Sequence, residues 1–366
     1  MKKAVKDTFL AGIELQAKRI PGEYQNDMVV LGIESSCDET AAAVVKDGCD
    51  VLSSVVSSQI EIHHQYGGVV PELASRKHIE NIVFVVDEAV QRAGLTLAQI
   101  DAVSVTQGPG LIGSLLVGFS FAKSFSFARK IPWVGVDHLE GHISSVFLEN
   151  NSPSFPFVAL LVSGGHTSIY YVTSHTSFTL MGQTRDDAAG EAYDKVAKML
   201  DLGYPGGRVI DDLSKTGNAR TIVFPRPFLD KTLFDFSFSG LKTAVNRYIK
   251  TNPDDYKGQI PDIVASFQEA VIDVLSFKLF SAAKEKKVNH VAVVGGVAAN
   301  SRLREVVTEE ALKRNMSVHI PSVDFCGDNG AMIAAIGYHY LERGEYSNRG
   351  DDVYSRSWVA IGKKHK

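Results

Sequence analysis

The chain has 366 residues, of which 45% are hydrophobic and 22% charged, and its formal net charge is −4. This composition is typical of a globular protein and excludes a disordered or fibrous chain. It also excludes a membrane-spanning protein and predicts no membrane partner, because no apolar run approaches the roughly 18–20 residues that cross a bilayer. The acidic balance excludes RNA binding through a general basic surface, so an RNA substrate would meet a local patch or a partner protein.

The start of the chain and its cysteines indicate the compartment. Residues 1–27 are partly basic but lack the continuous apolar core of roughly 7–15 residues found in a secretory signal. Cys37, Cys49 and Cys326 have spacings that fit neither a disulfide framework nor a zinc finger. We therefore expect a cytoplasmic protein. Either residues 1–27 form a loose N-terminal extension, or Met28 is the true start of the protein.

The first half of the chain alternates strands and helices. An apolar strand at 28–33 runs into a polar loop at 34–40, and a second strand follows at 41–45. The elements expected after it are a helix at 78–94, a strand at 100–106, a helix at 111–130, a strand at 133–136 and a helix that carries His142.

The second half repeats this pattern weakly, with a strand from 157, a glycine loop at 163–167 and another strand. Further predicted elements are helices at 191–200 and 261–285, a strand at 290–294, a helix from 301 and a last helix at 329–343. Such alternation predicts an α/β fold with helices on both faces of a sheet. We expect one domain at 28–153, a second at 154–345 and a tail at 346–366, with a cleft between the domains.

Four glycine loops follow or precede the predicted strands and helices, at 108–110, 163–167, 204–207 and 295–300. Glycine lets the backbone approach a ligand closely, and successive free N–H groups can hold an anion. Each loop alone is equally consistent with a tight structural turn. None matches the Rossmann or P-loop pattern, but together they predict a nucleotide-like ligand.

A metal site is predicted from His138 and His142, which are four residues apart and share one face of a helix. Helical HxxxH can offer two imidazoles to one ion, or the pair can be structural. Glu140 lies between the histidines and points away from their face, so the geometry of a zinc protease is not supplied. Asp328 is our choice of third ligand, although a carboxylate there could instead cap the last helix.

Acidic residues form two further groups. Asp38 and Glu39, in the first loop, could act as a base or orient a substrate amine, or they could be ordinary turn residues. Asp194 shares a helix face with Glu191, and Asp211 is a candidate partner for a ribose hydroxyl.

Taken in order, the motifs are GIESSCDET, QGPGLIGSLLVG, VDHLEGH, LVSGGHT, DDAAGEAYDKVAKMLDLGYPGG, FSFSGLKTA, VVGGVAAN and CGDNGAM. In this combination the chain resembles the bacterial TsaD-type tRNA threonylcarbamoyladenosine transferases, formerly described as O-sialoglycoprotein endopeptidases. The resemblance covers about residues 28–345 and leaves the extension 1–27 aside. It implies an actin-like ATPase fold, as in sugar kinases and Hsp70, with two related domains around a nucleotide cleft.

The resemblance also implies a reaction and its residues. The threonylcarbamoyl group of threonylcarbamoyl-AMP would move to N6 of adenosine 37 in tRNAs that read codons beginning with A, and AMP would leave. The family's metal ligands fall on His138, His142 and Asp328, and its acidic loop residues on Asp38 and Glu39. Its substrate-binding positions fall on Leu161, Val162, Ser163, Gly164, Gly165, Asp194, Gly207, Asp211 and Asn300.

Cofactor and partners follow from the same resemblance. One divalent ion per subunit is expected; the ligand types permit Fe²⁺ or Zn²⁺, of which we favour Fe²⁺. Archaeal and eukaryotic relatives have a tyrosine ligand where this chain has Leu161, so substrate or water would complete the coordination. The bacterial relatives work with a TsaB-like inactive paralogue and a TsaE-like P-loop ATPase. The competing hypotheses are an actin-fold small-molecule kinase and a nucleotide-switched scaffold.

Overall fold

The computed structural model describes residues 27–227 and 233–355. The predicted extension at 1–27 therefore lies outside the described residues except for Asp27, as do residues 356–366 of the predicted tail. Within the described part, no helix is long and apolar enough to cross a membrane.

The first half of the chain forms a five-stranded sheet in the order β3-β2-β1-β4-β5. β1 pairs antiparallel with β2 and parallel with β4, which in turn pairs parallel with β5. The strands are β1 (Val29–Glu34), β2 (Glu39–Lys46), β3 (Asp50–Ser58), β4 (Ala102–Gly108) and β5 (Trp133–Asp137). β1 is buried almost throughout, because helices cover both faces of the sheet.

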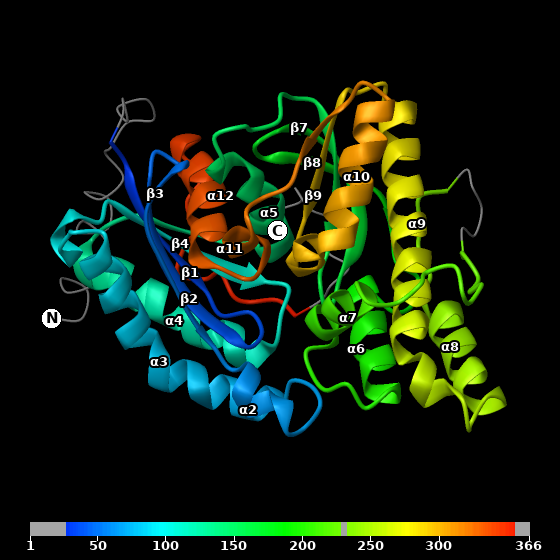
Figure 1. Ribbon diagram of the computed structural model, residues 1–366. Coiled ribbons are helices and arrows are strands. Elements are labelled where there is room, and N and C mark those ends of the chain that lie inside the picture. The colour runs from blue at the N-terminus through cyan, green and yellow to red at the C-terminus, as the bar shows by residue number, and fades with distance from the viewer. Residues whose placement is uncertain (1–26, 228–232, 356–366) are drawn as a thin grey trace, which may run out of the picture.

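The second half forms a sheet in the order β10-β9-β6-β7-β8. Taken from β8 to β10, this order matches that of the first sheet at every strand. Here β6 is the central strand, antiparallel to β7 and parallel to β9. The strands are β6 (Phe157–Val162), β7 (Thr167–Ser174), β8 (Ser177–Gln183), β9 (His290–Val294) and β10 (Ser317–His319). The predicted α/β fold of two related halves is confirmed (Figure 1).

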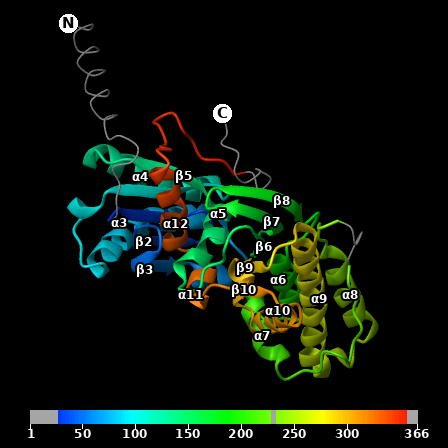
Figure 2. The same cartoon turned by 90° about the horizontal axis from the view of Figure 1, so that it is seen from above.

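Helices cover the outer face of each sheet. On the first, α3 (Pro71–Arg92) and α4 (Ile112–Arg129) pack on one another and on β2 and β4. On the second, α9 (Ile260–Lys286) lies in the largest core cluster and is flanked by α6 (Ala189–Met199), α7 (Gly206–Ser214), α8 (Ser239–Thr251) and α10 (Ser301–Lys313). Figure 2 shows the two sheets with these helices at opposite ends of the molecule.

Two helices fill the space between the sheets, α5 (His138–Ser144) and α12 (Gly330–Glu342). Alternate residues of β6 divide between two cores. Val158 and Leu160 face α9, whereas Ala159 and Leu161 pack in one cluster with residues of α5 and α12. Although α12 follows the second sheet in the chain, it lies against β1, β2 and β4 of the first. The predicted domain boundary between residues 153 and 154 remains a prediction.

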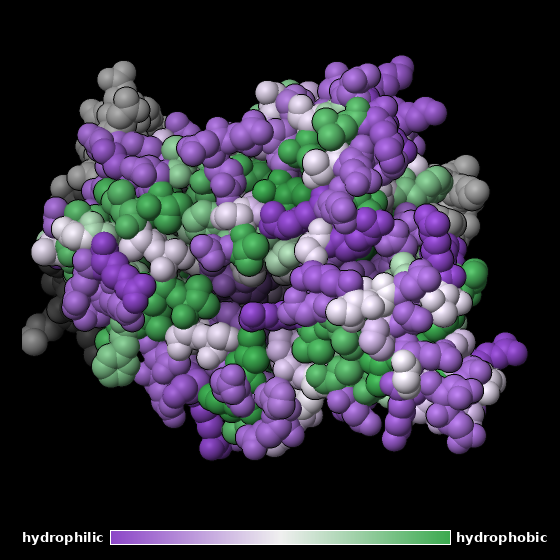
Figure 3. Space-filling model, viewed as in Figure 1, coloured by the Kyte–Doolittle hydropathy of each residue, from purple (hydrophilic) through white to green (hydrophobic). Residues whose placement is uncertain are grey.

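Several element boundaries differ from the prediction. α3 begins at Pro71 rather than at 78, since proline has the φ angle of a first helical residue and lacks an N–H that would go unpaired there. The helices α7 and α8 were not predicted. α8 depends on a distant residue, because the carboxylate of Asp186 accepts hydrogen bonds from the backbone N–H groups of Phe238 (2.8 Å) and Ser239 (3.3 Å) at its start. On the face shown in Figure 3, hydrophilic residues predominate and hydrophobic ones form smaller groups between them.

Candidate metal centre and substrate cleft

Both predicted histidine ligands lie on the short helix α5, which directly follows β5. Asp137 is the N-cap of this helix, and its Oδ1 accepts a hydrogen bond from the Leu139 N–H at 2.8 Å. Every residue of α5 is buried. The rings of His138 and His142 lie nearly perpendicular, with centroids 4.6 Å apart, so their nitrogen atoms face one small volume.

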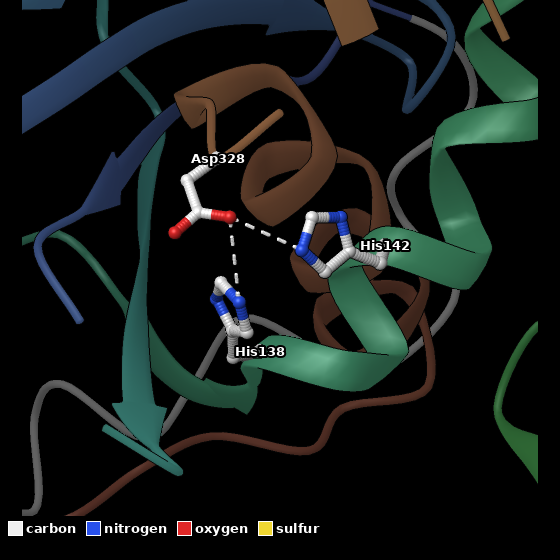
Figure 4. A group of neighbouring side chains, drawn as sticks. All are labelled: His138, His142 and Asp328. Atoms are coloured by element: carbon white, nitrogen blue, oxygen red, sulfur yellow. Dashed lines mark ion pairs between the residues drawn. The ribbon is translucent and has the colours of Figure 1, made fainter. Parts of the chain in front are cut away.

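Asp328 completes this group from the loop between α11 (Val323–Cys326) and α12. Its Oδ1 lies 3.1 Å from Nε2 of His142 and 3.6 Å from Nε2 of His138 (Figure 4). The three ligand atoms lie within 4.8 Å of one another. The alternative role for Asp328 is wrong, because the N-cap of α12 is Asn329, whose Oδ1 accepts from the Met332 N–H at 2.9 Å.

The residues fit a divalent transition-metal ion. His142 is fully buried. Its Nε2 lies 3.1 Å from Oδ1 of Asp328 without the alignment of a hydrogen bond, and its Nδ1 has no hydrogen-bond partner in the part of the chain that the structure describes. Buried polar atoms are rarely left without a well-formed hydrogen bond, and an ion between Nε2 and the carboxylate would satisfy both groups. Two imidazoles and one carboxylate that is only one-fifth exposed form a donor set that leaves further coordination positions open.

Glu34 supports the site and was missed from the sequence. Its Oε2 lies 2.9 Å from Nδ1 of His138, and it also accepts a hydrogen bond from the Thr106 hydroxyl at 2.5 Å. This carboxylate is completely buried at the end of β1. With Nδ1–H donated to Glu34, the lone pair of Nε2 is directed to the side of Asp328. Carboxylates placed behind metal-binding histidines commonly fix the ring in this way.

The charges of the group are strongly interdependent. Burial alone would raise the pKa of Glu34, but the charge and hydrogen bond of His138 outweigh it and lower the pKa. Burial likewise opposes protonation of His138, but Asp328 and Glu34 raise its pKa to about 9. For Asp328 the histidines overcome burial, so its pKa falls below the ordinary value. The site therefore favours a positive charge between the two carboxylates.

Replacing Glu34 by glutamine is expected to weaken metal binding about 10- to 100-fold, the usual effect of losing a residue that supports a ligand. The amide keeps the size of the side chain but removes its negative charge and can present an N–H₂ group to His138. Isothermal titration of the metal-free protein with Zn²⁺ measures the change. An unaltered affinity in E34Q would mean that Glu34 does not tune the site.

Glu140 does not act as the glutamate of a protease site but makes a structural contact with another helix. Its Oε2 accepts a hydrogen bond from the Tyr340 hydroxyl at 2.8 Å, and Tyr340 belongs to α12. Gly141 lies against the same helix, since a Cβ atom there would come within 2.8 Å of Ile333. α12 therefore holds α5 directly, and Asp328 lies just before α12. One helix thus sets the position of all three candidate ligands.

The first loop lies beside this group. Asp38 is buried, and Glu39 accepts a hydrogen bond from the Ser58 hydroxyl at 3.1 Å. Burial, followed by the charges of Asp328 and Asp38, raises the pKa of Glu39 well above its ordinary value. His78 on α3, which sequence reasoning missed, holds the loop: its ring nitrogens lie 2.7 Å from the Thr40 hydroxyl and 3.0 Å from the Cys37 carbonyl.

The glycine turn at 163–166 lies on the other side of the group. The Ser163 N–H donates to the His166 carbonyl at 2.8 Å, which closes the turn. Gly164 and Gly165 are exposed, and a Cβ atom on either would meet nothing within 4 Å. Burial, and then the charges of His138 and His142, lower the pKa of His166 to about 4, so the turn ends next to the candidate metal ligands.

Neighbouring glycines let other elements approach this turn closely. Gly295 has φ +94°, and a Cβ atom there would lie 2.4 Å from the Val162 carbonyl oxygen. A Cβ atom on Gly190, in the first turn of α6, would lie 2.6 Å from the Ser163 carbonyl oxygen. The predicted residues Leu161 and Val162 are fully buried in β6, so the open backbone of the turn is at Gly164 and Gly165.

The remaining predicted substrate residues either lie at the start of a helix or hydrogen-bond to one. Asp194 accepts a hydrogen bond from the Gly206 N–H (2.8 Å) at the start of α7, where Gly207 has open space around it. Asp211 accepts from both the N–H and the hydroxyl of Ser301, each at 3.0 Å, at the start of α10. Asn300 caps α10 through the Leu303 N–H and donates to Gln268 at 2.7 Å.

The repeated sheets and the site between them define a two-lobed protein of the actin-like ATPase fold. Solved structures support this class. HypF in its phosphate- and nucleotide-bound form has a TM-score of 0.59 at 15% identity, with 88% of this chain and 48% of that chain covered. Component A of (R)-2-hydroxyglutaryl-CoA dehydratase from Acidaminococcus fermentans has a TM-score of 0.51 at 13% identity, with 85% and 98% covered. These likenesses concern the fold alone.

Sequence comparison identifies the family. Residues 50–335 match the model of TsaD, tRNA N6-adenosine threonylcarbamoyltransferase. A protein of that name from Desulforapulum autotrophicum is 59% identical, with 90% of this chain and 99% of the relative covered. Another, from Syntrophus aciditrophicus, is 53% identical, with 90% and 97% covered. The chain belongs to the TsaD family and is a transferase of tRNA threonylcarbamoyladenosine modification. These matches do not favour the kinase or the scaffold hypothesis.

Proposed function

We propose that the protein transfers the threonylcarbamoyl group from threonylcarbamoyl-AMP to N6 of adenosine 37, in tRNAs that read codons beginning with A. The observation that carries this proposal is the group of His138, His142 and Asp328 next to the open turn at Gly164 and Gly165. An acyl-phosphate donor needs anion-binding backbone, and a carbonyl under attack needs positive charge nearby. The cytoplasm, where tRNA is modified, is the proposed place of action.

His138, His142 and Asp328 would hold the metal ion, for which Fe²⁺ is our first choice and Zn²⁺ the alternative. When bound, the ion supplies Lewis-acid stabilisation of negative charge on the substrate. Glu34 keeps His138 in the tautomer that presents Nε2 to the ion. Support comes from the buried Nε2 of His142, which faces Asp328 without an aligned hydrogen bond, and from the donor types, which suit either metal.

The acyl transfer requires a base for the attacking amine. As the N6 nitrogen forms its bond to the carbamoyl carbon, the bond from that carbon to the phosphate oxygen breaks, and AMP leaves with the electron pair. Asp38 or Glu39 would orient the amine and accept its proton. The raised pKa of Glu39 makes this carboxylate a stronger base than an ordinary glutamate.

The chain's own backbone and polar groups would hold the donor. The N–H groups of Gly164 and Gly165 would bind the acyl-phosphate region, while Ser163 closes the turn and Leu161 and Val162 fix it from the buried strand. The adenosine moiety would lie against four residues that are at the starts of α7 and α10 or hydrogen-bond to them: Asp194, Gly207, Asp211 and Asn300.

Reconstitution tests this function. The protein is incubated with chemically prepared threonylcarbamoyl-AMP, unmodified tRNA and the two candidate partner proteins, and tRNA digests are analysed by mass spectrometry. We expect threonylcarbamoyladenosine and AMP in equal amounts. A matched tRNA with guanosine at position 37 should give neither product. Donor consumption without modified nucleoside in the adenosine tRNA would contradict the proposed transfer.

A TsaB-like paralogue and a TsaE-like P-loop ATPase are the proposed protein partners, and the structure suggests a surface for the paralogue. Ile79, Val83 and Phe84 on α3 are 65%, 59% and 73% exposed. Ile112 and Leu116 on the adjoining α4 are also exposed. Ile79 and Val83 are four residues apart, as are Ile112 and Leu116, and Phe84 directly follows Val83, so exposed apolar side chains gather on two packed helices. Such a surface suits a helical face of a related subunit.

The Phe84→Glu variant is expected to weaken binding of the paralogue at least about 30-fold, because central aromatic residues of interfaces contribute about 2 kcal/mol or more. Gel filtration of the mixture measures complex formation. Leu312→Glu is the matched control, since Leu312 on α10 is equally exposed (72%) but lies outside this face. If both variants co-elute with the paralogue, the interface lies elsewhere.

A further inference from the structure

The segment after α12 returns along the edge of the first sheet; we call residues 344–355 the C-terminal strap (red in Figure 1). β5 is the edge strand of that sheet, and the strap covers it. The Ser347 N–H donates to the Trp133 carbonyl at 3.0 Å, and the Gly135 N–H donates to the Ser347 hydroxyl at 2.8 Å. The strap therefore follows β5 towards the start of the metal helix α5.

Specific contacts hold the strap in this place. The Gln107 side-chain amide donates to the Asp352 backbone carbonyl at 2.7 Å, and the Gln107 backbone carbonyl accepts from the Tyr354 N–H at 3.1 Å. Lys123 donates to the carbonyl of Asp351 at 2.9 Å. Gly108 permits this approach, since a Cβ atom there would lie only 2.1 Å from the Tyr354 carbonyl oxygen. Residues of β4 as well as β5 therefore hold the strap in place.

Near its end, the strap contacts the start of α5 through the side chain of Tyr354. The Tyr354 hydroxyl donates to Oδ2 of Asp137 at 2.8 Å. The other oxygen of Asp137 accepts from the Leu139 N–H and so caps α5. Asp137 precedes His138 directly and is buried. A helix of seven residues has little stiffness of its own, so the direction of its first turn depends on this carboxylate.

We propose that Tyr354 is a positioning residue for the metal centre. It fixes the carboxylate of Asp137, Asp137 fixes the first turn of α5, and that turn sets Nε2 of His138 towards Asp328. Tyr340 of α12 holds Glu140 of the same helix, so tyrosines from two separate segments hold α5. The inference rests on the proposed metal site and extends it to the strap, which the sequence motifs did not include.

The test is the Zn²⁺ affinity of the metal-free full-length protein, measured by competition with a chromogenic chelator. Tyr354→Phe removes only the hydroxyl, and we expect it to weaken Zn²⁺ binding about 3- to 10-fold, somewhat less than the loss of a group in direct contact with a ligand. Tyr248→Phe is the matched control. Tyr248 is also half-buried and donates to Gln259 at 2.5 Å, but it lies on α8 in the other half of the molecule.

The visible absorption spectrum of bound Co²⁺ distinguishes a positioning role of Tyr354 from a general effect on protein stability. Co²⁺ reports ligand geometry through its visible absorption, which we expect to change in Y354F but not in Y248F, although both variants lose one hydrogen bond. Equal Zn²⁺ affinity and identical Co²⁺ spectra in Y354F and wild type would overturn the inference and leave the metal site intact. Wild-type protein that binds neither ion would overturn the metal site and this inference together.

Discussion

The His142→Leu variant is expected to lose threonylcarbamoyl transfer by about 1,000-fold or more and to purify without stoichiometric metal. A bound metal ion supplies several kcal/mol of transition-state stabilisation, and each 1.4 kcal/mol or so is a factor of ten in rate. His142 is a cleaner position than His138, because removing His138 would take away the imidazole that pairs with the buried carboxylate of Glu34. Leucine fills the space of the ring but offers no ligand atom. Metal analysis and the reconstituted assay measure the two effects.

The matched control is His290→Leu. His290 also lies in a core sheet, but at the start of β9, the end of the strand remote from the glycine loop that follows Val294. Its Nδ1 lies 3.0 Å from Nε2 of His319. We expect this variant to keep its metal content and its transfer rate. Full activity in H142L, with the same metal content as wild type, would show that the ion is held elsewhere.

The Gly32→Ala variant is expected to destabilise the protein by about 3 kcal/mol, although it adds a single methyl group. A Cβ atom on Gly32 would lie 2.1 Å from the Gly330 carbonyl oxygen and 2.6 Å from the Ala334 nitrogen, both in α12. Backbone atoms cannot turn aside as a flexible side chain can, so α12 must move away from β1, which costs packing energy. Urea unfolding followed by circular dichroism measures the loss.

The same movement should reach the metal centre, because Asp328 lies two residues before Gly330. A displacement of about 1 Å at a catalytic group can cost roughly 100-fold in rate, so we expect transfer to fall by that order in G32A. Gly258→Ala is the matched control: Gly258 is exposed and a Cβ atom there would meet nothing within 4 Å. Wild-type stability in G32A would contradict the tight packing of α12 on β1.

The sequence predicted the parts of the fold that follow local patterns. The apolar strand, polar loop and second strand recur at residue 28 and at residue 157, and both units are central antiparallel pairs of their sheets. Asp328 was predicted as the third ligand because it lies between glycines at the start of a predicted helix, and the geometry then excluded the alternative capping role. By contrast, α8 depends on Asp186, some fifty residues earlier in the chain, because its own N-cap residue, Phe238, has no side chain that can cap the helix.

The supporting residues of the candidate site could not be predicted, because their partners are remote in the chain. Glu34 contacts His138 across 104 positions, and Tyr354 contacts Asp137 across 217. One signal was present for Glu34, a carboxylate at the end of an otherwise apolar strand, where a buried charge requires a partner. Tyr354 has no such signal, since a lone tyrosine in a polar tail is ordinary.

The central claim is that His138, His142 and Asp328 hold a metal ion on which transfer depends. The most direct measurement is single-turnover transfer by chelator-stripped protein, with threonylcarbamoyl-AMP, tRNA and partners supplied, before and after addition of one equivalent of Fe²⁺ or Zn²⁺. We predict no threonylcarbamoyladenosine from the stripped wild type, recovery on adding metal, and no recovery in H142L. Full transfer by verified metal-free protein would contradict the claim.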